Sequence, residues 1–227
     1  MAWDEWTRTV EVEPSIYAAD FARLGEQVDL LLEAGARVFH FDVGDGHFVP
    51  SITMGPIVLQ AISRRIHERG GVVDCHLMLE TPERQFDALA AAGGDSVTVH
   101  LEACDDLPAV ASAARRHGLG VGMAFKPETE AEDAARRAIA AGVDIVLCMS
   151  IEPGYSGQAF MPAAVERIRV VRKLLPSGMR VQVDGGINPE TIRLTHDAGA
   201  SLFVAGASVF GDEDPPQAYR RLVETLS

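Results

Sequence analysis

Short apolar runs alternate along the chain with longer segments in which apolar residues recur every three or four positions. The short runs are rich in Val, Ile and Phe, which predicts buried β-strands. The longer segments have helical spacing: Leu24, Val28 and Leu31 fall on one face of segment 21–33, and segment 162–175 shows the same pattern. The predicted strands are 10–16, 37–42, 72–78, 96–100, 120–126, 144–150, 180–184 and 201–205.

Residues that favour helix ends lie at the borders of the helical segments. Asp20, Thr81 before Pro82, and Asn188 before Pro189 predict helix N-termini, because short polar side chains cap free N–H groups and proline suits the first turn. Glycine-containing stretches predict the C-terminal ends of four helices, at 34–37, 91–94, 141–144 and 198–201.

The alternation continues over the whole chain without a long linker, so we predict a single domain over residues 1–227. Eight strand–helix units in a chain of this length are typical of one TIM (β/α)₈ barrel. A doubly wound open sheet is the main alternative, but it needs a glycine-rich turn after its first strand. The first strand here runs into residues 14–21 (PSIYAADF), which contain no glycine. We therefore predict the barrel, with functional residues at the C-terminal ends of its strands.

The chain is acidic, with 20 basic residues, 33 acidic residues and a formal net charge of −13. This balance argues against nucleic acid or an anionic membrane as the main partner. No stretch approaches the about 18 apolar residues of a membrane span. An anionic substrate would have to be bound by local groups, against the overall field of the protein.

The cysteines and the first residues bear on the cellular compartment. Cys75, Cys104 and Cys148 have no metal-type spacing, and buried free thiols fit a reducing compartment. Residues 1–14 (MAWDEWTRTVEVEP) have no apolar core, so they do not resemble a secretory signal. We expect a soluble cytoplasmic protein.

Histidine and aspartate residues mark the ends of three predicted strands. His40 and Asp42 are two residues apart and therefore share a strand face, where they form a chelating pair for a divalent cation. His76 ends another strand, and Asp184 ends a third, next to two glycines. Together the four residues predict a metal site, while a His–Asp pair that only caps a strand is the structural alternative.

Three glycine-containing loops predict a phosphate site on the same rim. They are residues 152–158 (EPGYSGQ), the pair Gly185–Gly186, and residues 205–208 (AGAS). The loops after strands seven and eight commonly bind phosphate in barrels. Backbone N–H groups are directed donors that do not require basic side chains. Tight turns without a ligand are the alternative for any one loop.

These residues resemble the ribulose-phosphate 3-epimerase family, in order from Pro14 to about Phe210. Seven stretches carry the resemblance: PSIYAADFARLG, HFDVGDGHFVPSITMGP, DCHLM, VTVHLEA, PGYSGQAF, VDGGIN and VAGASVF. The resemblance implies a barrel enzyme that contains one divalent metal ion and epimerises a ketose phosphate at C3.

The resemblance also implies roles for individual residues. His40, Asp42, His76 and Asp184 match the family's metal ligands, and Asp42 and Asp184 match its acid/base pair. The expected substrate shell is Ser15, His76, Met78, Met149, Gly154, Ser156, Gly157, Gly185, Gly186, Gly206 and Ala207. Zn²⁺ is the metal expected first, and Fe²⁺, Mn²⁺ and Co²⁺ suit the same donors. A homo-oligomer, dimer or hexamer, is also implied.

The chain departs from the family pattern around the substrate. Gly44 stands where a methionine is usual, from which we expect a larger or wetter pocket. Tyr17, Ser51, Ser156 and Ala207 also differ from the usual residues, and Ala207 lacks a serine hydroxyl at the phosphate. None of these positions is an expected metal ligand or acid/base residue.

The expected reaction is the conversion of D-ribulose 5-phosphate to D-xylulose 5-phosphate through an enediolate, with a small-molecule substrate as the partner. Three alternatives remain open. One is another ketose phosphate such as D-allulose 6-phosphate, and a second is a non-catalytic sugar-phosphate-binding barrel. The third is a phosphate-binding barrel with metal-free chemistry, such as a decarboxylase, which would need a lysine at a strand end; Lys126 is the candidate.

Overall fold

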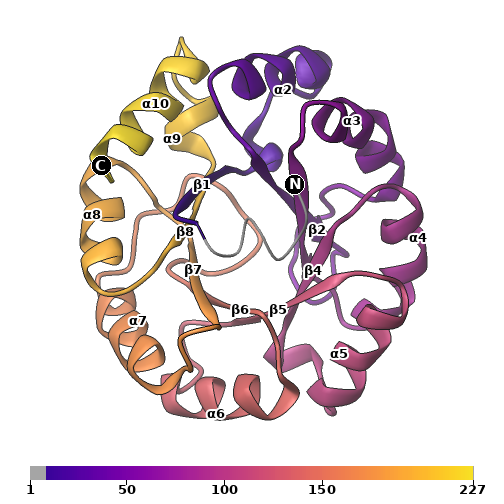
Figure 1. The fold of residues 1–227 in the computed structure, drawn as a ribbon, viewed down its shortest axis with the longest axis vertical. Coiled ribbons are helices and arrows are strands. Elements are labelled where there is room, and N and C mark those ends of the chain that lie inside the picture. Colours follow the sequence, from indigo (N-terminus) through magenta and orange to yellow (C-terminus); the bar gives the residue numbers. More distant parts are fainter. Residues whose placement is uncertain (1–8, 227) are drawn as a thin grey trace.

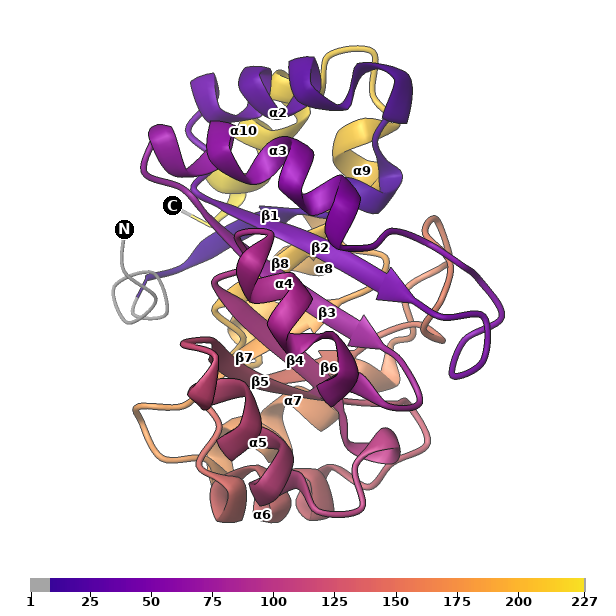
Figure 2. The same cartoon turned by 90° about the vertical axis from the view of Figure 1, so that its right-hand side faces the viewer.

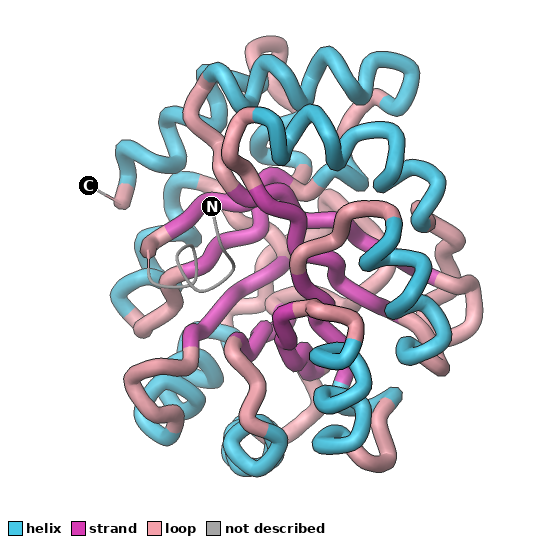
Figure 3. Tube along the Cα trace, turned by 45° about the vertical axis from the view of Figure 1, so that its right-hand side comes forward, coloured by secondary structure: helices cyan, strands magenta, loops and turns pink. Residues whose placement is uncertain are grey.

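The computed structural model describes residues 9–226, which form a ring of eight parallel strands surrounded by helices (Figures 1 and 3). The strand order is β1-β8-β7-β6-β5-β4-β3-β2, and a parallel bridge between Ser15 and His40 joins its two ends. The predicted (β/α)₈ barrel is therefore confirmed, and the open sheet is excluded. The prediction of no signal sequence falls mainly on residues 1–8, which lie outside the described residues.

The elements follow the predicted order closely. The strands are β1 Glu11–Pro14, β2 Val38–Gly44, β3 Val72–Met78, β4 Ser96–His100, β5 Gly120–Phe125, β6 Ile145–Met149, β7 Arg180–Asp184 and β8 Leu202–Ala205. The α-helices are α2 Leu24–Glu33, α3 Pro56–Glu68, α4 Phe86–Ala91, α5 Leu107–Arg116, α6 Ala131–Ala141, α7 Ala163–Leu174, α8 Pro189–Asp197, α9 Ala207–Phe210 and α10 Pro215–Thr225. The 3₁₀ helices of residues 9–226 are η1 Ile16–Ala18, η2 Phe21–Arg23, η3 Pro82–Gln85 and η4 Leu101–Ala103.

The two faces of each strand have different surroundings. In β2, Phe39 and Phe41 pack in the main core, which lies between the strands and the helices and includes Val28 of α2. Val38, His40 and Asp42 alternate with them and therefore point into the barrel. An apolar layer fills the start of the barrel interior, made by Val38, Val72, Ile145 and Leu202. Beyond this layer, the inward-facing residues of β2 and β7 are polar, at His40, Asp42 and Gln182.

The helix ends agree with most of the sequence predictions. Asp20 accepts a hydrogen bond from the N–H of Ala22, and Asn188 and Thr191 form a capping box at the start of α8. A helix, η3, does begin after Thr81 as predicted, but the Thr81 side chain makes no capping hydrogen bond, so the expected cap is wrong. The four predicted helix C-termini each contain a glycine with a positive φ angle: Gly35, Gly93, Gly142 and Gly199. The three cysteines are buried and unpaired, as predicted.

The strand ends are directed to one side of the molecule (Figure 2). The arrows of β2 and β3 point to the side on which the loop between β2 and α3 extends outward. This side is the mouth of the barrel, where the side chains at the ends of neighbouring strands come together. Among the described residues, no helix combines the length and apolar character that a membrane span requires.

We expect the apolar layer of the barrel interior to contribute strongly to stability. Ile145 is 0% exposed within it, so Ile145→Ala should lower the free energy of unfolding by about 2–5 kcal/mol through lost burial and a cavity. Ile57, which is 81% exposed, provides the matched control, and Ile57→Ala should cost less than about 0.5 kcal/mol. Urea denaturation followed by circular dichroism measures both. Equal losses for the two variants would contradict the described packing.

Candidate functional site

Four ionisable side chains meet at the mouth of the barrel. His40 and Asp42 project from β2, His76 from β3 and Asp184 from the end of β7. The strand register places Asp42 beside His76. One nitrogen or carboxylate oxygen from each residue lies within 4.8 Å of the corresponding atoms of the other three, so the group could hold one metal ion. The structure thus brings together the four residues that the sequence predicted as ligands.

The contacts show which atom each residue presents to the centre. Asp42 Oδ1 lies 3.1 Å from His76 Nδ1 and 3.3 Å from His40 Nε2. His76 Nδ1 is also 3.8 Å from Asp184 Oδ2. His40 therefore presents Nε2 and His76 presents Nδ1. Neither ring nitrogen of His40 has a hydrogen-bond partner among residues 9–226, although both are buried, and two imidazoles with two carboxylates suit a divalent transition metal.

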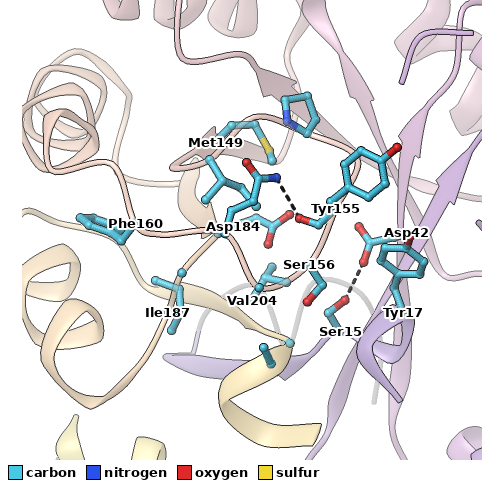
Figure 4. Close-up of a pocket in the computed structure, with 18 of the residues that line it drawn as sticks. Ser15, Tyr17, Asp42, Met149, Tyr155, Ser156, Phe160, Asp184, Ile187 and Val204 are labelled. Carbon is cyan, nitrogen blue, oxygen red and sulfur yellow. Dashed lines mark hydrogen bonds between the residues drawn. The ribbon is translucent and has the colours of Figure 1, made fainter. Parts of the chain in front are cut away.

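The two carboxyl groups have opposite electrostatic environments. Burial raises the pKa of Asp184, and the negative charge of Asp42 raises it further, against the lowering effects of His40 and His76. Burial also acts to raise the pKa of Asp42, but the charges and hydrogen bonds of His40 and His76 outweigh it, and the pKa of Asp42 is lowered. Ser15 Oγ donates to Asp42 Oδ2 over 2.6 Å and fixes this carboxylate (Figure 4). The pKa of Asp184 is raised to about 6, so the two carboxyl groups separate into one charged and one protonated group as the pH falls below that value.

A cavity of about 350 Å³ opens above these side chains. Asp42 and Asp184 line it, while His40 and His76 lie beneath it with 0% exposure. The expected substrate-shell residues other than His76 all line the cavity: Ser15, Met78, Met149, Gly154, Ser156, Gly157, Gly185, Gly186, Gly206 and Ala207. Figure 4 shows Ser15, Asp42 and Tyr17 on one side of this cavity and Asp184 and Met149 on another.

The loops after β6 and β7 approach each other closely because their contact positions are glycines. A Cβ atom on Gly186 would lie 2.6 Å from the backbone nitrogen of Phe160, and one on Gly185 would lie 2.9 Å from that of Ile151. Both glycines also have positive φ angles, of 63° and 119°. Only glycine allows this arrangement, which leaves backbone groups along the cavity wall.

The expectation that Gly44 leaves a larger or wetter pocket is wrong. A Cβ atom on Gly44 would lie 2.8 Å from the carbonyl oxygen of Ser51 and 3.1 Å from a methyl group of Val49. The loop after β2 folds back over this position, and the Gly44 N–H donates to Thr53 Oγ1 over 2.7 Å. Gly44 does not line the cavity. Its role is to let the loop approach β2, since the space of a side chain is already filled.

Lys126 does not occupy the position that metal-free barrel chemistry would require. Its Nζ lies 4.3 Å from the centre of the Phe48 ring, and Lys126 is not among the cavity residues. The alternative that depended on a lysine at the strand end therefore loses its candidate.

Sequence reasoning missed a polar layer beneath the four residues. Gln182 Nε2 donates to Glu13 Oε2 over 2.6 Å and to Asp74 Oδ2 over 3.0 Å. Asp74 Oδ2 in turn lies 3.4 Å from His40 Nδ1. Burial raises the pKa of Glu13 to about 7, and the charge of Asp74 contributes in the same direction. The available signal was a polar residue at alternate positions of otherwise apolar strands.

Cavity residues from the loops were also missed, because loop residues carry no periodic pattern. They include Ile151, Ala159, Phe160 and Ile187, whereas Pro153, Tyr155, Gln158 and Ser208 lie in the loops that the sequence predicted for phosphate. Val204, in β8, also lines the cavity and was not predicted. A second group, His100 and Glu102, lies beside His76 and does not line the cavity.

The fold and the cluster define a (β/α)₈ barrel with a His/Asp centre that could hold a metal ion at its mouth. The sequence pattern of the ribulose-phosphate 3 epimerase family matches residues 11–210. The chain belongs to this family, which confirms the resemblance. It is 41% identical to a ribulose-phosphate 3-epimerase of Mycobacterium leprae, with 93% of this chain and 92% of that protein covered. It is 37% identical to the Bacillus subtilis enzyme of the same name, with 92% and 96% covered.

More distant solved structures share the barrel. A 3-hexulose-6-phosphate synthase from Salmonella typhimurium matches with a TM-score of 0.72 and 17% identity over 95% of this chain and 98% of that one. Orotidine 5′-phosphate decarboxylase from Pyrococcus horikoshii OT3 matches with a TM-score of 0.69 and 16% identity, again over 95% and 98%. At these identities the likeness concerns the fold.

We expect an alanine at position 44 to be destabilising. The added Cβ would meet a backbone oxygen, which cannot move as a flexible side chain can, so Gly44→Ala should cost about 1–3 kcal/mol of stability. Gly178→Ala is the control, because nothing lies within 4 Å of its Cβ position. Thermal denaturation measures both. If Gly44→Ala were as stable as Gly178→Ala, the position would be open after all.

Proposed function

We propose that this protein is a metal-dependent 3-epimerase that interconverts D-ribulose 5-phosphate and D-xylulose 5-phosphate. The observation that carries the proposal is the pair Asp42 and Asp184, which line one cavity with pKa values shifted in opposite directions. Epimerisation at C3 requires a base to remove a proton next to a carbonyl and an acid to return one from the other face. Two carboxyl groups with different protonation states can supply both.

The metal proposal rests on the donor set. His40 Nε2, His76 Nδ1 and one oxygen each of Asp42 and Asp184 would hold one divalent ion, with Zn²⁺ expected first and Fe²⁺, Mn²⁺ or Co²⁺ as alternatives. When bound, the ion would polarise the substrate carbonyl and stabilise the negative charge of the enediolate. His40 Nε2 supports this assignment, because it is buried, makes no hydrogen bond and lies 3.3 Å from Asp42 Oδ1, where a shared ion would satisfy both groups.

The two aspartates exchange roles with the direction of reaction. In one direction the charged carboxylate takes the C3 proton, and the protonated carboxyl returns a proton to the opposite face of the enediolate. Ser15 holds Asp42 through Oδ2 and leaves Oδ1 directed toward His76 and His40. Met78 and Met149 provide apolar walls that limit water at the reacting carbons.

The remaining cavity residues support a small phosphorylated substrate. The glycine-containing loops that include Gly154, Gly157, Gly185 and Gly206 would bind the phosphate through backbone N–H groups, which suits an acidic protein. The cavity of about 350 Å³ fits a pentulose phosphate. Because Gly44 adds no space, the main argument for a longer hexulose phosphate is weakened. We also infer one domain, a cytoplasmic location and a homo-oligomer, dimer or hexamer; the family resemblance suggests the oligomer.

A panel of ketoses in D₂O tests the proposal. We expect ¹H NMR to show exchange at C3 of D-ribulose 5-phosphate at a higher rate than for D-allulose 6-phosphate, and little exchange for unphosphorylated D-ribulose. Removal of metal with a chelator should abolish exchange, and Zn²⁺ or Co²⁺ should restore it. A higher rate for allulose 6-phosphate would make the protein a hexulose-phosphate epimerase. Absence of exchange with every ketose in metal-loaded protein would favour a binding protein.

The acid/base assignment is tested by Asp184→Asn. The amide keeps the size of the side chain but cannot transfer the proton, so the exchange rate at C3 should fall by about 10²–10⁴-fold. Asp105→Asn, at an exposed position, is the matched control and should exchange at the parent rate. Metal content is measured on the same samples. A folded, metal-loaded Asp184→Asn protein with near-parent exchange would contradict the assignment.

A further inference from the structure

A chain of three ionisable side chains leads away from the centre through His76. His76 Nε2 lies 2.8 Å from His100 Nε2, and His100 Nδ1 lies 3.4 Å from Glu102 Oε2. Both histidines are 0% exposed. His100 is the last residue of β4, and Glu102 lies in η4 directly after it. The Nδ1 of His76 thus faces the metal-type centre, and its Nε2 faces His100.

The chemistry of Glu102 dictates where the protons lie along this chain. A carboxylate only accepts hydrogen bonds, so His100 must carry its proton on Nδ1 to bind Glu102. The Nε2 of a neutral His100 then offers a lone pair, and the 2.8 Å contact requires His76 to carry its proton on Nε2. His76 Nδ1 lies 3.1 Å from Asp42 Oδ1, and a metal bound there would replace any proton that Nδ1 shares with this carboxylate. With its other proton held on Nε2, His76 stays neutral when Nδ1 gives that proton up. An unprotonated nitrogen is what a metal ligand requires.

We propose that His100 and Glu102 are positioning residues that fix the proton of His76 on Nε2 and so prepare Nδ1 to bind the metal. The proposal rests on the metal site of the proposed function and names two residues to which that function assigns no part. The opposite arrangement, with a proton on His76 Nδ1, would direct an N–H group at Asp42 and block coordination.

Several donors keep Glu102 in its acceptor role. The N–H of Lys126 donates to Glu102 Oε1 over 2.8 Å, and the hydroxyl of Thr129 donates to the same oxygen. These bonds leave Oε2 for His100. The Phe48 ring packs on His100 at 4.8 Å between ring centres, and Lys126 Nζ lies 4.3 Å from the centre of the Phe48 ring. The loop after β5 therefore holds Glu102 in place, and the loop after β2 covers His100.

The other histidine of the centre, His40, is oriented by carboxylates that it faces directly. His40 Nδ1 lies 3.4 Å from Asp74 Oδ2 and 3.7 Å from Glu13 Oε2, so carboxylates face its far nitrogen directly. His76 points toward β4, where the nearest carboxylate is too distant for direct contact and His100 spans the gap. Each of the two imidazoles thus has a carboxylate behind it, once directly and once through a second imidazole. Carboxylates behind ligand histidines orient the ring and raise its basicity.

Glu102→Gln tests the direction of the hydrogen bonds that run from His76 through His100 to Glu102. Glutamine has nearly the same shape, but its amide can donate to His100 Nδ1 and so allows the blocking arrangement of protons. We expect the Kd for Zn²⁺ and Co²⁺, measured by chelator competition without substrate, to rise about 10–100-fold. Glu128→Gln removes the same charge from an exposed position in the adjoining loop and should keep the parent Kd. A parent-like Kd for folded Glu102→Gln would overturn the proposal.

Imidazole ¹⁵N NMR on the Zn²⁺-loaded parent protein provides a test that needs no variant. We expect protonated Nε2 and metal-bound Nδ1 for His76, and protonated Nδ1 with an unprotonated Nε2 for His100. A proton on His100 Nε2 would overturn the proposal. Both measurements are made without substrate, so a negative result with every ketose would defeat the proposed function and leave this inference standing.

Discussion

The arrangement of the site follows from the free-energy cost of burying charged side chains inside a barrel. The ligand-type atoms of His40, Asp42, His76 and Asp184 lie within 4.8 Å of one another, with both imidazoles fully buried and both carboxyl groups largely so. Burial alone would neutralise both carboxyl groups, and their mutual repulsion adds to that cost. The cluster persists because imidazole groups lie between the carboxylates, and a bound divalent ion would complete the compensation.

The surrounding strands supply this compensation in layers. Apolar side chains fill the beginning of the barrel, and Gln182 then links Glu13 and Asp74 beneath His40. On the side of β4, His100 contacts His76 and Glu102 contacts His100, so a carboxylate also lies near this part of the centre. A parallel ladder holds the backbone of each strand, so side chains that are costly in isolation are kept at fixed distances. Preorganised groups of this kind need little rearrangement during a reaction.

The sequence predicted the fold well because the barrel repeats one simple unit. Strand β3, Val72–Met78, and strand β4, Ser96–His100, have their predicted bounds, since turn residues and a change of period mark both ends. Strand β2 ends two residues later than predicted, at Gly44, because Val43 and Gly44 still pair with Leu77 and Met78 of β3. Thr81 shows the limit of local signals: it has the residue types of a cap, but the chain there forms a 3₁₀ helix without the capping bond.

For the site, the sequence by itself determined the four ligand-type residues, because strand periodicity and strand ends fix which side chains face the barrel mouth. It also identified the five glycines that line the cavity. Only the tertiary structure decided how those groups act, because the distances between side chains on different strands depend on how the strands pair. The fold filled the space beside Gly44, turned Lys126 onto Phe48 and placed His100 behind His76. It also separated the pKa values of Asp42 and Asp184, which depend on neighbours far away in the chain.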